Sequence, residues 1–345
     1  MRVIGYKDID RAEWSALVNA SATGTWFQTP EVFDFFNAQK KLFKPFAIAI
    51  EKSESRVESR ESRELRGVCV GYVTVEKSAF KQFLTRRAII IGGPCWANDA
   101  TNEEVSLLLS TLRKQLSIGA NAPIYIECRN FNDYSRWKDA FASAGFDYMS
   151  HLNFHVDCRN KEAMWERLSE NRHRQVRKAQ ATVECLTNEG LNELEVREWY
   201  EILRELYRTK VKTPLWPVEF FLEAYRQGVG KFLLVKHAGK VIGGSMVVTD
   251  GKAVYEWFEC GLNADYKEQY PSVMATWAGM QYAQETGCAR YDMMGAGEPG
   301  VPYGVRDFKS EFGGELVEHG RFLCVNKPML YLMGKFGVKL LKHLR

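Results

Sequence analysis

The stretch KFLLVKHAGKVIGGSMVVTDGKAVYEWFECG, residues 231–261, determines the fold. It contains three strand-like runs, at 231–236, 241–249 and 253–261. The pairs Ala238-Gly239 and Asp250-Gly251 separate these runs, and short turns of this kind are typical of antiparallel hairpins. We therefore expect three antiparallel strands that follow one another directly.

Helical patterns surround these strands in a fixed order. Two amphipathic stretches, 194–207 and 217–225, precede the strands. A third stretch, 272–285, follows them and ends before Gly287, and a short strand is expected at 290–293. Two helices, three antiparallel strands, a helix and a strand are the order of the GNAT acyltransferase fold.

The first half of the chain repeats this order in a weaker form, with paired strands and interposed helices. A chain of 345 residues exceeds the size at which one hydrophobic core usually stops growing, so two packed units are expected. An internal duplication explains both observations. We predict an α+β protein of two tandem GNAT-like domains, residues 1–158 and 159–345, each with a mixed central sheet flanked by helices.

Two segments lie outside the repeated order. Residues 54–63 form a tandem Glu-Ser-Arg run with little apolar content, which predicts a mobile insertion near residues 51–66 of the first domain. The stretch from Met329 to Arg345 alternates apolar residues with lysines, which predicts a basic amphipathic helix. Such a helix can lie on an anionic membrane surface or pack on the second domain, and both alternatives stay open.

Composition favours a globular protein. Hydrophobic residues make up 46% of the chain and charged residues 26%, and the longest apolar runs are the length of a strand. Lys7 and Asp8 occupy positions where a secretory signal needs apolar residues, so we expect a cytoplasmic protein, at the inner face of the membrane if the last helix binds lipid. A net charge of +4 is too small to define a nucleic-acid-binding protein.

The cysteines and histidines show no pattern of a metal site. Eight cysteines lie far apart without a CxxC pair, and six histidines are equally dispersed. Scattered cysteines in a reducing compartment are usually buried free thiols. We therefore expect no metal, no disulfide framework and no resident cofactor.

Four segments of the second half carry a family resemblance: NRHRQVRKA (171–179), KEQYPS (267–272), YDMMG (291–295) and GVRDFKSEFGGE (304–315). They resemble the FemAB family, which adds amino acids from aminoacyl-tRNA to peptidoglycan precursors, and the related FemAB-like acyltransferases. In the first half, Phe27-Gln28-Thr29-Pro30 looks like the family's entry motif. The resemblance implies a tandem GNAT fold and transfer of an acyl or aminoacyl group onto an amine.

The resemblance also implies a catalytic Phe-Lys pair at Phe308 and Lys309. Acyl transfer to an amine passes through a tetrahedral intermediate whose oxygen gains negative charge, and a fixed cation stabilises that charge. Lys309 is the candidate cation, and a solvated surface lysine is the alternative. Asp292, at the end of an apolar strand, is the candidate for proton transfer, and a cap for the following loop is its alternative.

Substrate contacts are expected from both halves. The loop 296–303 is rich in Gly and Pro, which predicts a mobile segment where substrate enters. Candidate contact residues, for some of which simple packing is the alternative, are Tyr270, Tyr303, Arg306, Trp26, Gln28, Glu127, Arg129, Lys212 and Trp216.

Two further stretches bear on the acyl donor. A CoA-dependent GNAT protein usually holds pyrophosphate on a Gly-rich loop before its central helix, but 262–271 contains no glycine, which disfavours CoA as donor. A basic cluster at the start of the second half is a candidate for binding RNA phosphates or a diphosphate, with a solvated helix face as the alternative. Its members are Arg172, Arg174, Arg177 and Lys178.

The sequence thus predicts an aminoacyl- or acyltransferase that acts on an amine of a cell-wall or envelope precursor, with aminoacyl-tRNA or acyl-CoA as donor. One alternative is a CoA- or carrier-protein-dependent N-acyltransferase for an amino sugar or polysaccharide. Another is a non-catalytic binding protein on a duplicated scaffold, because fold alone does not fix function.

Overall fold

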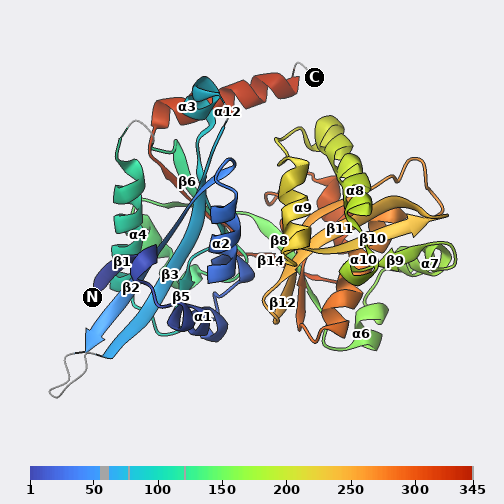
Figure 1. The fold of residues 1–345 in the computed structure, drawn as a ribbon, viewed down its shortest axis with the longest axis horizontal. Helices are drawn as coiled ribbons and strands as arrows, with labels where there is room; N and C mark the ends of the chain where they lie inside the picture. Colours follow the sequence, from blue (N-terminus) through green and yellow to red (C-terminus); the bar gives the residue numbers. More distant parts are fainter. Residues whose placement is uncertain (55–61, 77, 120–121, 344–345) are drawn as a thin grey trace. The chain divides into compact units, whose positions relative to one another are not determined.

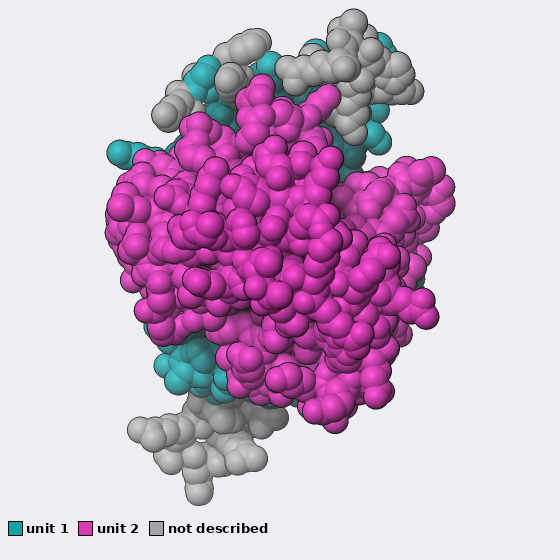
Figure 2. All heavy atoms as spheres, turned by 90° about the vertical axis from the view of Figure 1, so that its right-hand side faces the viewer, with its two compact units in different colours: residues 1–150, 319–345 teal, residues 151–318 magenta. Residues whose placement is uncertain are grey.

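The computed structural model describes residues 1–54, 62–76, 78–119 and 122–343, and it divides into two compact units (Figure 1). Unit 1 comprises Met1–Ser150 and His319–Arg345, and unit 2 comprises His151–Glu318. Figure 2 colours unit 1 teal and unit 2 magenta. Each unit has its own sheet and its own hydrophobic core.

Unit 2 contains a seven-stranded mixed sheet in the order β14-β8-β13-β12-β11-β10-β9. Only β12 and β13 pair in parallel among its described strands. The three predicted strands are confirmed, with Ala238 and Gly239 both at positive φ in the first hairpin turn. The strands are β8 (Leu152–Asp157), β9 (Glu184–Leu186), β10 (Lys231–His237), β11 (Lys240–Thr249), β12 (Ala253–Gly261), β13 (Arg290–Asp292) and β14 (Glu315–Glu318).

Helices cover both faces of this sheet. Cys260 of β12 contacts the Trp199 carbonyl in α8, whereas its neighbour Glu259 is directed to Ser272 of α10, and successive strand residues point to opposite faces. α10 is also the crossover that joins β12 to the parallel strand β13. The helices are α6 (Lys161–Glu166), α7 (Glu170–Gln180), α8 (Glu193–Leu206), α9 (Val218–Arg226), α10 (Pro271–Glu285) and α11 (Gly304–Ser310), with a π-helical turn at Tyr207–Val211.

Unit 1 contains an eight-stranded sheet in which β1-β2-β3-β4-β6-β15-β7 are neighbours and β5 pairs with β3. Its strands are β1 (Arg2–Gly5), β2 (Phe43–Glu54), β3 (Ser62–Thr74), β4 (Ala88–Gly92), β5 (Cys95–Trp96), β6 (Tyr125–Asn130), β7 (Asp147–Met149) and β15 (Arg321–Val325). Its helices are α1 (Arg11–Ala20), α2 (Pro30–Ala38), α3 (Ala79–Thr85), α4 (Asn102–Ser117), α5 (Lys138–Ser143) and α12 (Pro328–His343).

The two units repeat one order of elements, so the predicted tandem GNAT-like fold is confirmed. α1, α2, β2, β3, β4, α4 and β6 of unit 1 correspond to α8, α9, β10, β11, β12, α10 and β13 of unit 2. In both units the crossover helix leads into a strand that is parallel to a strand of the preceding group. Local signals support these elements, as in α4, where Thr101 and Glu104 form a reciprocal capping box.

In each sheet, one strand comes from a part of the chain that is distant in the sequence from the strands beside it. β15 lies between β6 and β7 in unit 1, and β8 lies in the same way between β13 and β14 in unit 2. The units therefore divide at residues 150/151 and 318/319 rather than after residue 158, because β8 completes the second sheet and β15 the first. The terminal helix α12 accordingly belongs to unit 1, not to the second domain as predicted.

Some local predictions differ from the structure. Residues 171–180, expected only as a basic segment, lie in helix α7, whose N-cap Ser169 accepts a hydrogen bond from the Arg172 amide. The Glu-Ser-Arg insertion is centred on residues 55–61, which lie outside the described residues, whereas 51–54 and 62–65 are paired strand residues of β2 and β3. Among the described helices, none is long and apolar enough to cross a bilayer.

Candidate functional site

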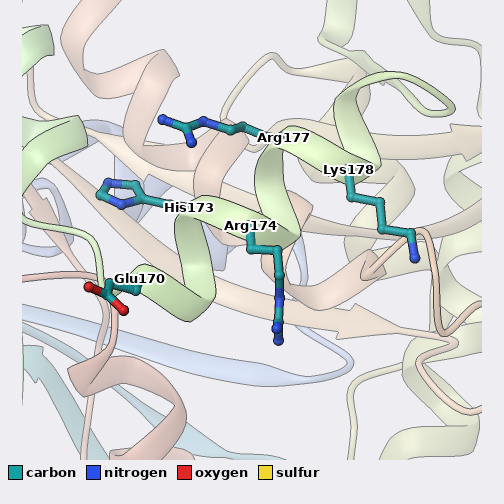
Figure 3. Close-up of a pocket in the computed structure, with 5 residues that line it drawn as sticks. All are labelled: Glu170, His173, Arg174, Arg177 and Lys178. Carbon is teal, nitrogen blue, oxygen red and sulfur yellow. The ribbon is translucent and has the colours of Figure 1, made fainter.

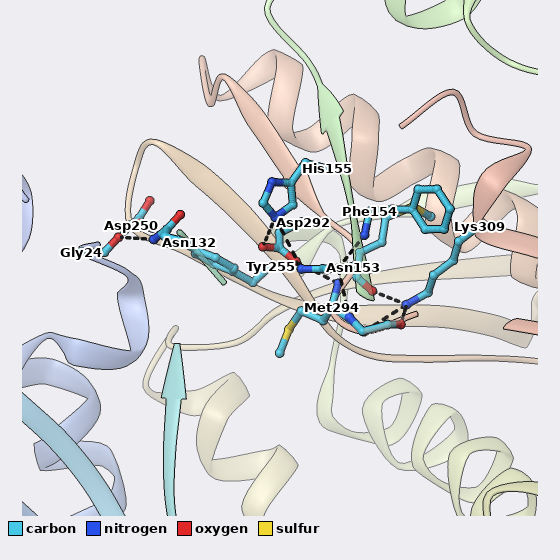
Figure 4. A network of polar contacts seen from close by, with 12 residues as sticks. Gly24, Asn132, Asn153, Phe154, His155, Asp250, Tyr255, Asp292, Met294 and Lys309 are labelled. Carbon is cyan, nitrogen blue, oxygen red and sulfur yellow. Dashed lines mark hydrogen bonds and ion pairs between the residues drawn. The ribbon is translucent and has the colours of Figure 1, made fainter. Parts of the chain in front are cut away.

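Lys309 holds the loop that follows β13. Its side chain is buried, and its ammonium donates to the backbone carbonyl oxygens of Met293, Met294 (3.0 Å) and Gly295 (2.8 Å) (Figure 4). Burial lowers the pKa of Lys309, although nearby carboxylates oppose this shift. Because an ammonium has three N–H donors, the loop uses all of them in this conformation.

Arg306 holds the next part of the same loop from one turn earlier in α11. Its guanidinium donates to the carbonyl oxygens of Ala296 (2.8 Å), Val301 (3.1 Å) and Glu298. The loop 296–303, predicted as a mobile entry segment, is therefore bonded to α11 at three carbonyls through Arg306, and Lys309 bonds the three carbonyls just before it. The guanidinium of Arg306, a predicted substrate contact, binds its own loop.

Asp292, at the end of β13, organises a buried polar network. Its carboxylate lies 3.1 Å from His155 Nε2 and accepts hydrogen bonds from Asn153 Nδ2 (2.7 Å) and the Met294 amide (2.9 Å) (Figure 4). Burial opposes ionisation, but the hydrogen bond and charge of His155 outweigh it and lower the pKa of Asp292. An ionised, fully buried carboxylate with these partners fits the predicted loop cap and orients His155.

Two carboxyl groups on β12 form a second polar cluster, and neither was predicted from the sequence as a site residue. Glu256 is buried and accepts from Thr276 Oγ1 (3.1 Å) and Tyr291 OH (2.7 Å). Glu259 is partly exposed, yet its Oε1 is buried and has no hydrogen-bond partner among the described residues. Burial, reinforced by the charge of Glu256, raises the pKa of Glu259 to about 8. Two glutamates within an apolar strand were the available sequence signal.

The N-terminus of α10 is capped by its own chain. Pro271 occupies the first helical position and has no N–H. The next amide, of Ser272, donates to Asn263 Oδ1 (3.1 Å), and Asn263 Nδ2 donates back to Ser272 Oγ (2.7 Å). Tyr270, a predicted substrate contact, is the N-cap residue at φ 45° and packs against the core of unit 2. In other proteins, amides at a helix N-terminus can bind an anion. At the start of α10, one of these amides is absent and the next is already hydrogen-bonded.

Arg172 is a core residue rather than part of a phosphate-binding surface. It is 5% exposed, and its guanidinium lies 4.6 Å from the Phe308 ring and 4.9 Å from the Phe312 ring. It also donates to the Phe308 carbonyl (3.2 Å). These contacts fasten α7 to the Phe308-Lys309 turn, which positions α11.

The other predicted basic residues line a shallow depression of about 560 Å³ on α7 (Figure 3). Lys178 pairs with Glu268, and the Arg177 guanidinium lies 5.4 Å from the Trp165 ring. The lining residues are Glu170, His173, Arg174, Arg177 and Lys178.

Three further candidates of unit 2 remain, and of these only Tyr303 lies at the loop that Arg306 holds. Tyr303 precedes α11 and is exposed. Trp216 packs among the rings of Phe220, Trp257 and Phe258. Lys212 is exposed and ends the π-helical turn at φ 55°.

The candidates of unit 1 make contacts within their own unit. Trp26 is buried against Phe27. Glu127 is almost buried between two guanidiniums, those of Arg129 (2.9 Å) and Arg321 (2.8 Å), which outweigh burial and lower the pKa of Glu127 to about 2.

Gln28 joins β3 and β4 where their ladder ends. Its buried amide donates to the carbonyls of Val70 (3.1 Å) and Ile91 (2.9 Å) and accepts from the Val70 amide (2.8 Å). Through Gln28, the predicted entry motif 27–30 therefore connects two strands of the unit 1 sheet.

Replacing Gln28 by Leu should destabilise the protein by roughly 3 kcal/mol, because three buried backbone groups lose their partner. Urea unfolding measures this loss, with the exposed Gln115→Leu of α4 as a control that should change little. Unchanged unfolding of Q28L together with weaker substrate binding would instead assign Gln28 to the substrate.

Within the described residues, no three His, Cys, Asp or Glu side chains come together in a metal-binding arrangement. All eight cysteines are free thiols, and seven of them are buried, as predicted.

The comparisons with known proteins place the fold. The family model described as an acetyltransferase (GNAT) domain matches residues 167–310. Among solved structures, FemX is 14% identical and matches 97% of this chain and 100% of its own with a TM-score of 0.70. L-PGS from Bacillus licheniformis is 10% identical, over 95% of this chain and 96% of its own, with a TM-score of 0.53.

A tandem GNAT protein from the clavulanic acid biosynthesis pathway is also 10% identical, over 94% of this chain and 98% of its own, with a TM-score of 0.53. No curated protein sequence gives a significant match. At these identities the structural likeness establishes the fold, and the predicted resemblance is confirmed at that level. The chain has the tandem GNAT fold, which it shares with FemX and with the tandem GNAT protein of the clavulanic acid pathway.

Proposed function

We propose that this protein is an acyltransferase that moves an aminoacyl group from an aminoacyl-tRNA onto an amine of a cell-wall or envelope precursor. The GNAT domain match over residues 167–310 supports acyl transfer, and the FemX fold supports an envelope acceptor. The observation that carries the choice of donor is the self-capped N-terminus of α10.

The cap disfavours CoA for a physical reason. Pyrophosphate binding at a helix N-terminus needs free amide N–H groups and close approach of the backbone. Pro271 supplies no N–H, and the Ser272 amide already bonds to Asn263. A donor that carries its acyl group on a ribose ester does not need this site.

The reaction forms an amide bond and breaks an ester bond. The neutral acceptor amine attacks the acyl carbon, the carbonyl oxygen becomes negative, and the ribose oxygen leaves and takes up a proton. In our proposal the Lys309 ammonium exchanges one of its loop carbonyls for the oxyanion, because an ionised oxygen is the stronger hydrogen-bond acceptor. Phe308 contributes by fixing α11 through Arg172.

Glu259 is our candidate for the proton acceptor. With a pKa of about 8 it is a stronger base than an ordinary carboxylate, and it is partly exposed. Asp292 and His155 are proposed to shape the loop beside Lys309 rather than to carry the proton. Tyr303, which is exposed next to this loop, is kept as a substrate contact.

The α7 depression is the proposed contact for tRNA phosphates. Replacing Arg174 and Arg177 by Ala should weaken tRNA binding and lower the slope of log K against log salt by roughly 1.5, because each lost phosphate contact removes counterion release. Filter binding over a salt series measures the slope. A control pair of exposed arginines on α8 and α9, Arg204→Ala and Arg226→Ala, should leave it unchanged. Equal slopes for both pairs would remove α7 from the RNA contact.

A second function has some support. The family model is an acetyltransferase domain, and the clavulanic acid pathway relative is named with reference to AcCoA. A CoA- or carrier-protein-dependent N-acyltransferase for an amino sugar or polysaccharide is therefore the alternative. A non-catalytic binding protein is disfavoured by the raised pKa of Glu259 and by the electrostatic interaction of Glu259 with Lys309.

Supplying one donor at a time distinguishes these functions. The protein is mixed with an amine-bearing precursor and either charged tRNA or acetyl-CoA, and loss of the acyl group is followed by mass spectrometry. Our proposal expects acceptor-dependent loss from tRNA only. Loss from acetyl-CoA selects the alternative, and loss from neither contradicts both enzymatic functions.

A further inference from the structure

The terminal helix α12 exposes one apolar stripe and does not bury it in unit 1. Met329, Leu332, Met333 and Phe336 are 77%, 62%, 63% and 71% exposed. They lie at positions i, i+3, i+4 and i+7, which form one stripe of a helix. An amphipathic helix that only packs on its own domain has this stripe buried, so the exposed stripe requires another explanation.

The other side of α12 attaches the helix to unit 1. The Tyr331 ring packs at 5.6 Å against Tyr125 of β6, and Leu330 is half-buried beside it. α12 also lies beside α3, where the Lys327 ammonium is 5.7 Å from the Phe83 ring (Figure 1). The orientation of the exposed stripe is therefore fixed by contacts on the opposite side of the helix.

α3 adds apolar surface next to α12. Phe83 and Leu84 are 53% and 37% exposed. Together with Met329, Leu332, Met333 and Phe336 they form what we call the α3–α12 surface. Two neighbouring elements thus expose large apolar side chains, which is unusual for a surface in contact with water alone.

The charge of this part of the chain indicates what covers the surface. Residues 319–345 contain no Asp or Glu but six Lys or Arg: Arg321, Lys327, Lys335, Lys339, Lys342 and Arg345. In the sequence, a further leucine follows at Leu340, and Lys335, Lys339 and Lys342 recur at intervals of four and three residues. A helix with an apolar stripe flanked by cations and free of acids matches the interface of an anionic bilayer.

We propose that the α3–α12 surface docks unit 1 on an anionic lipid bilayer, with α12 lying in the plane of the interface. The apolar stripe enters the boundary of the acyl chains, and the lysines remain among the lipid phosphates. This docking does not depend on the donor or on acyl transfer. It brings the enzyme to membrane-bound acceptors if the proposed function holds.

Vesicle flotation of the full chain tests the proposal. We expect binding to mixed phosphatidylcholine–phosphatidylglycerol vesicles, at least tenfold weaker binding to pure phosphatidylcholine, and a further loss as salt rises. Leu332→Glu combined with Phe336→Glu should reduce binding to the mixed vesicles by at least tenfold. Leu194→Glu, at a residue of α8 that is 70% exposed, is the matched control and should bind as wild type.

Two results would overturn membrane docking. One is equal flotation of wild type and the double variant. The other is a dimer in size-exclusion chromatography that the double variant dissociates while neither protein floats, because the surface then joins two copies of this chain. Circular dichroism of the double variant is expected to match wild type, since both side chains are exposed.

Discussion

Replacing Lys309 by Met is expected to lower the rate of acyl transfer by roughly 10²–10³-fold, the effect of removing one donor to a developing oxyanion. The same change also removes three hydrogen bonds from the loop after β13. Stability should therefore fall as well, by roughly 1–3 kcal/mol, because carbonyl acceptors lose their donor. Single-turnover kinetics and thermal unfolding of the same preparation measure the two effects.

Arg306 provides the control that separates catalysis from loop support. Arg306→Met removes bonds to three other carbonyls of the same loop but leaves the Lys309 ammonium in place. If Lys309 stabilises the oxyanion, K309M loses far more turnover than R306M at a temperature where both are folded. Equal losses of turnover would limit Lys309 to a structural role.

Replacing Glu259 by Gln is expected to stabilise the protein in a pH-dependent way. The pKa of Glu259 is raised from 4.5 to about 8, so the folded state binds this proton more tightly than the unfolded state. Protonated Glu259 makes its full contribution to stability below about pH 4.5, and this contribution is lost as pH rises through about 8. E259Q removes this pH dependence. Between about pH 5 and pH 8, its free energy of unfolding should therefore rise by roughly 3–4 kcal/mol relative to that of wild type.

Urea unfolding at the two pH values measures this gain. Glu198→Gln on the exposed surface of α8 is the control for the loss of one glutamate charge. A constant difference between E259Q and wild type over this range would contradict the raised pKa.

The pH dependence of turnover tests the proposed role of the same residue. Glu259 accepts a proton only when it is ionised, so wild-type turnover should rise with pH and level off above about 8. E259Q should lose this rise together with most of its activity. A rise that persists in E259Q assigns the titration to another group.

The fold could be predicted wherever the signals are local. The hairpin turns at 238–239 and 250–251 and the capping residue Thr101 determine their elements through short-range geometry. β8 and β15 could not be assigned to their sheets, because the partners of each strand lie far away in the sequence. Helix α7 was missed because its polar sequence shows little apolar periodicity, although Ser169 offered a cap signal.

The site was predictable in its motif but not in its contacts. The resemblance selected Lys309, yet nothing in the sequence showed that its donors bind the carbonyls of 293–295. Glu256 and Glu259 differ by three positions, which in a regular strand puts them on opposite faces. A bulge at Trp257 shifts the register of β12, so both glutamates interact with α10. The alternation of strand residues therefore does not predict that Glu256 and Glu259 lie on one face.

Direct detection of the product tests the central claim. Wild-type protein is mixed with charged tRNA and an amine-bearing envelope precursor, and the mass of the precursor is measured. We predict that it gains one aminoacyl residue through an amide bond that survives mild alkali. A precursor whose mass is unchanged while acetyl-CoA acylates it under the same conditions would contradict the proposal of a tRNA-dependent transferase.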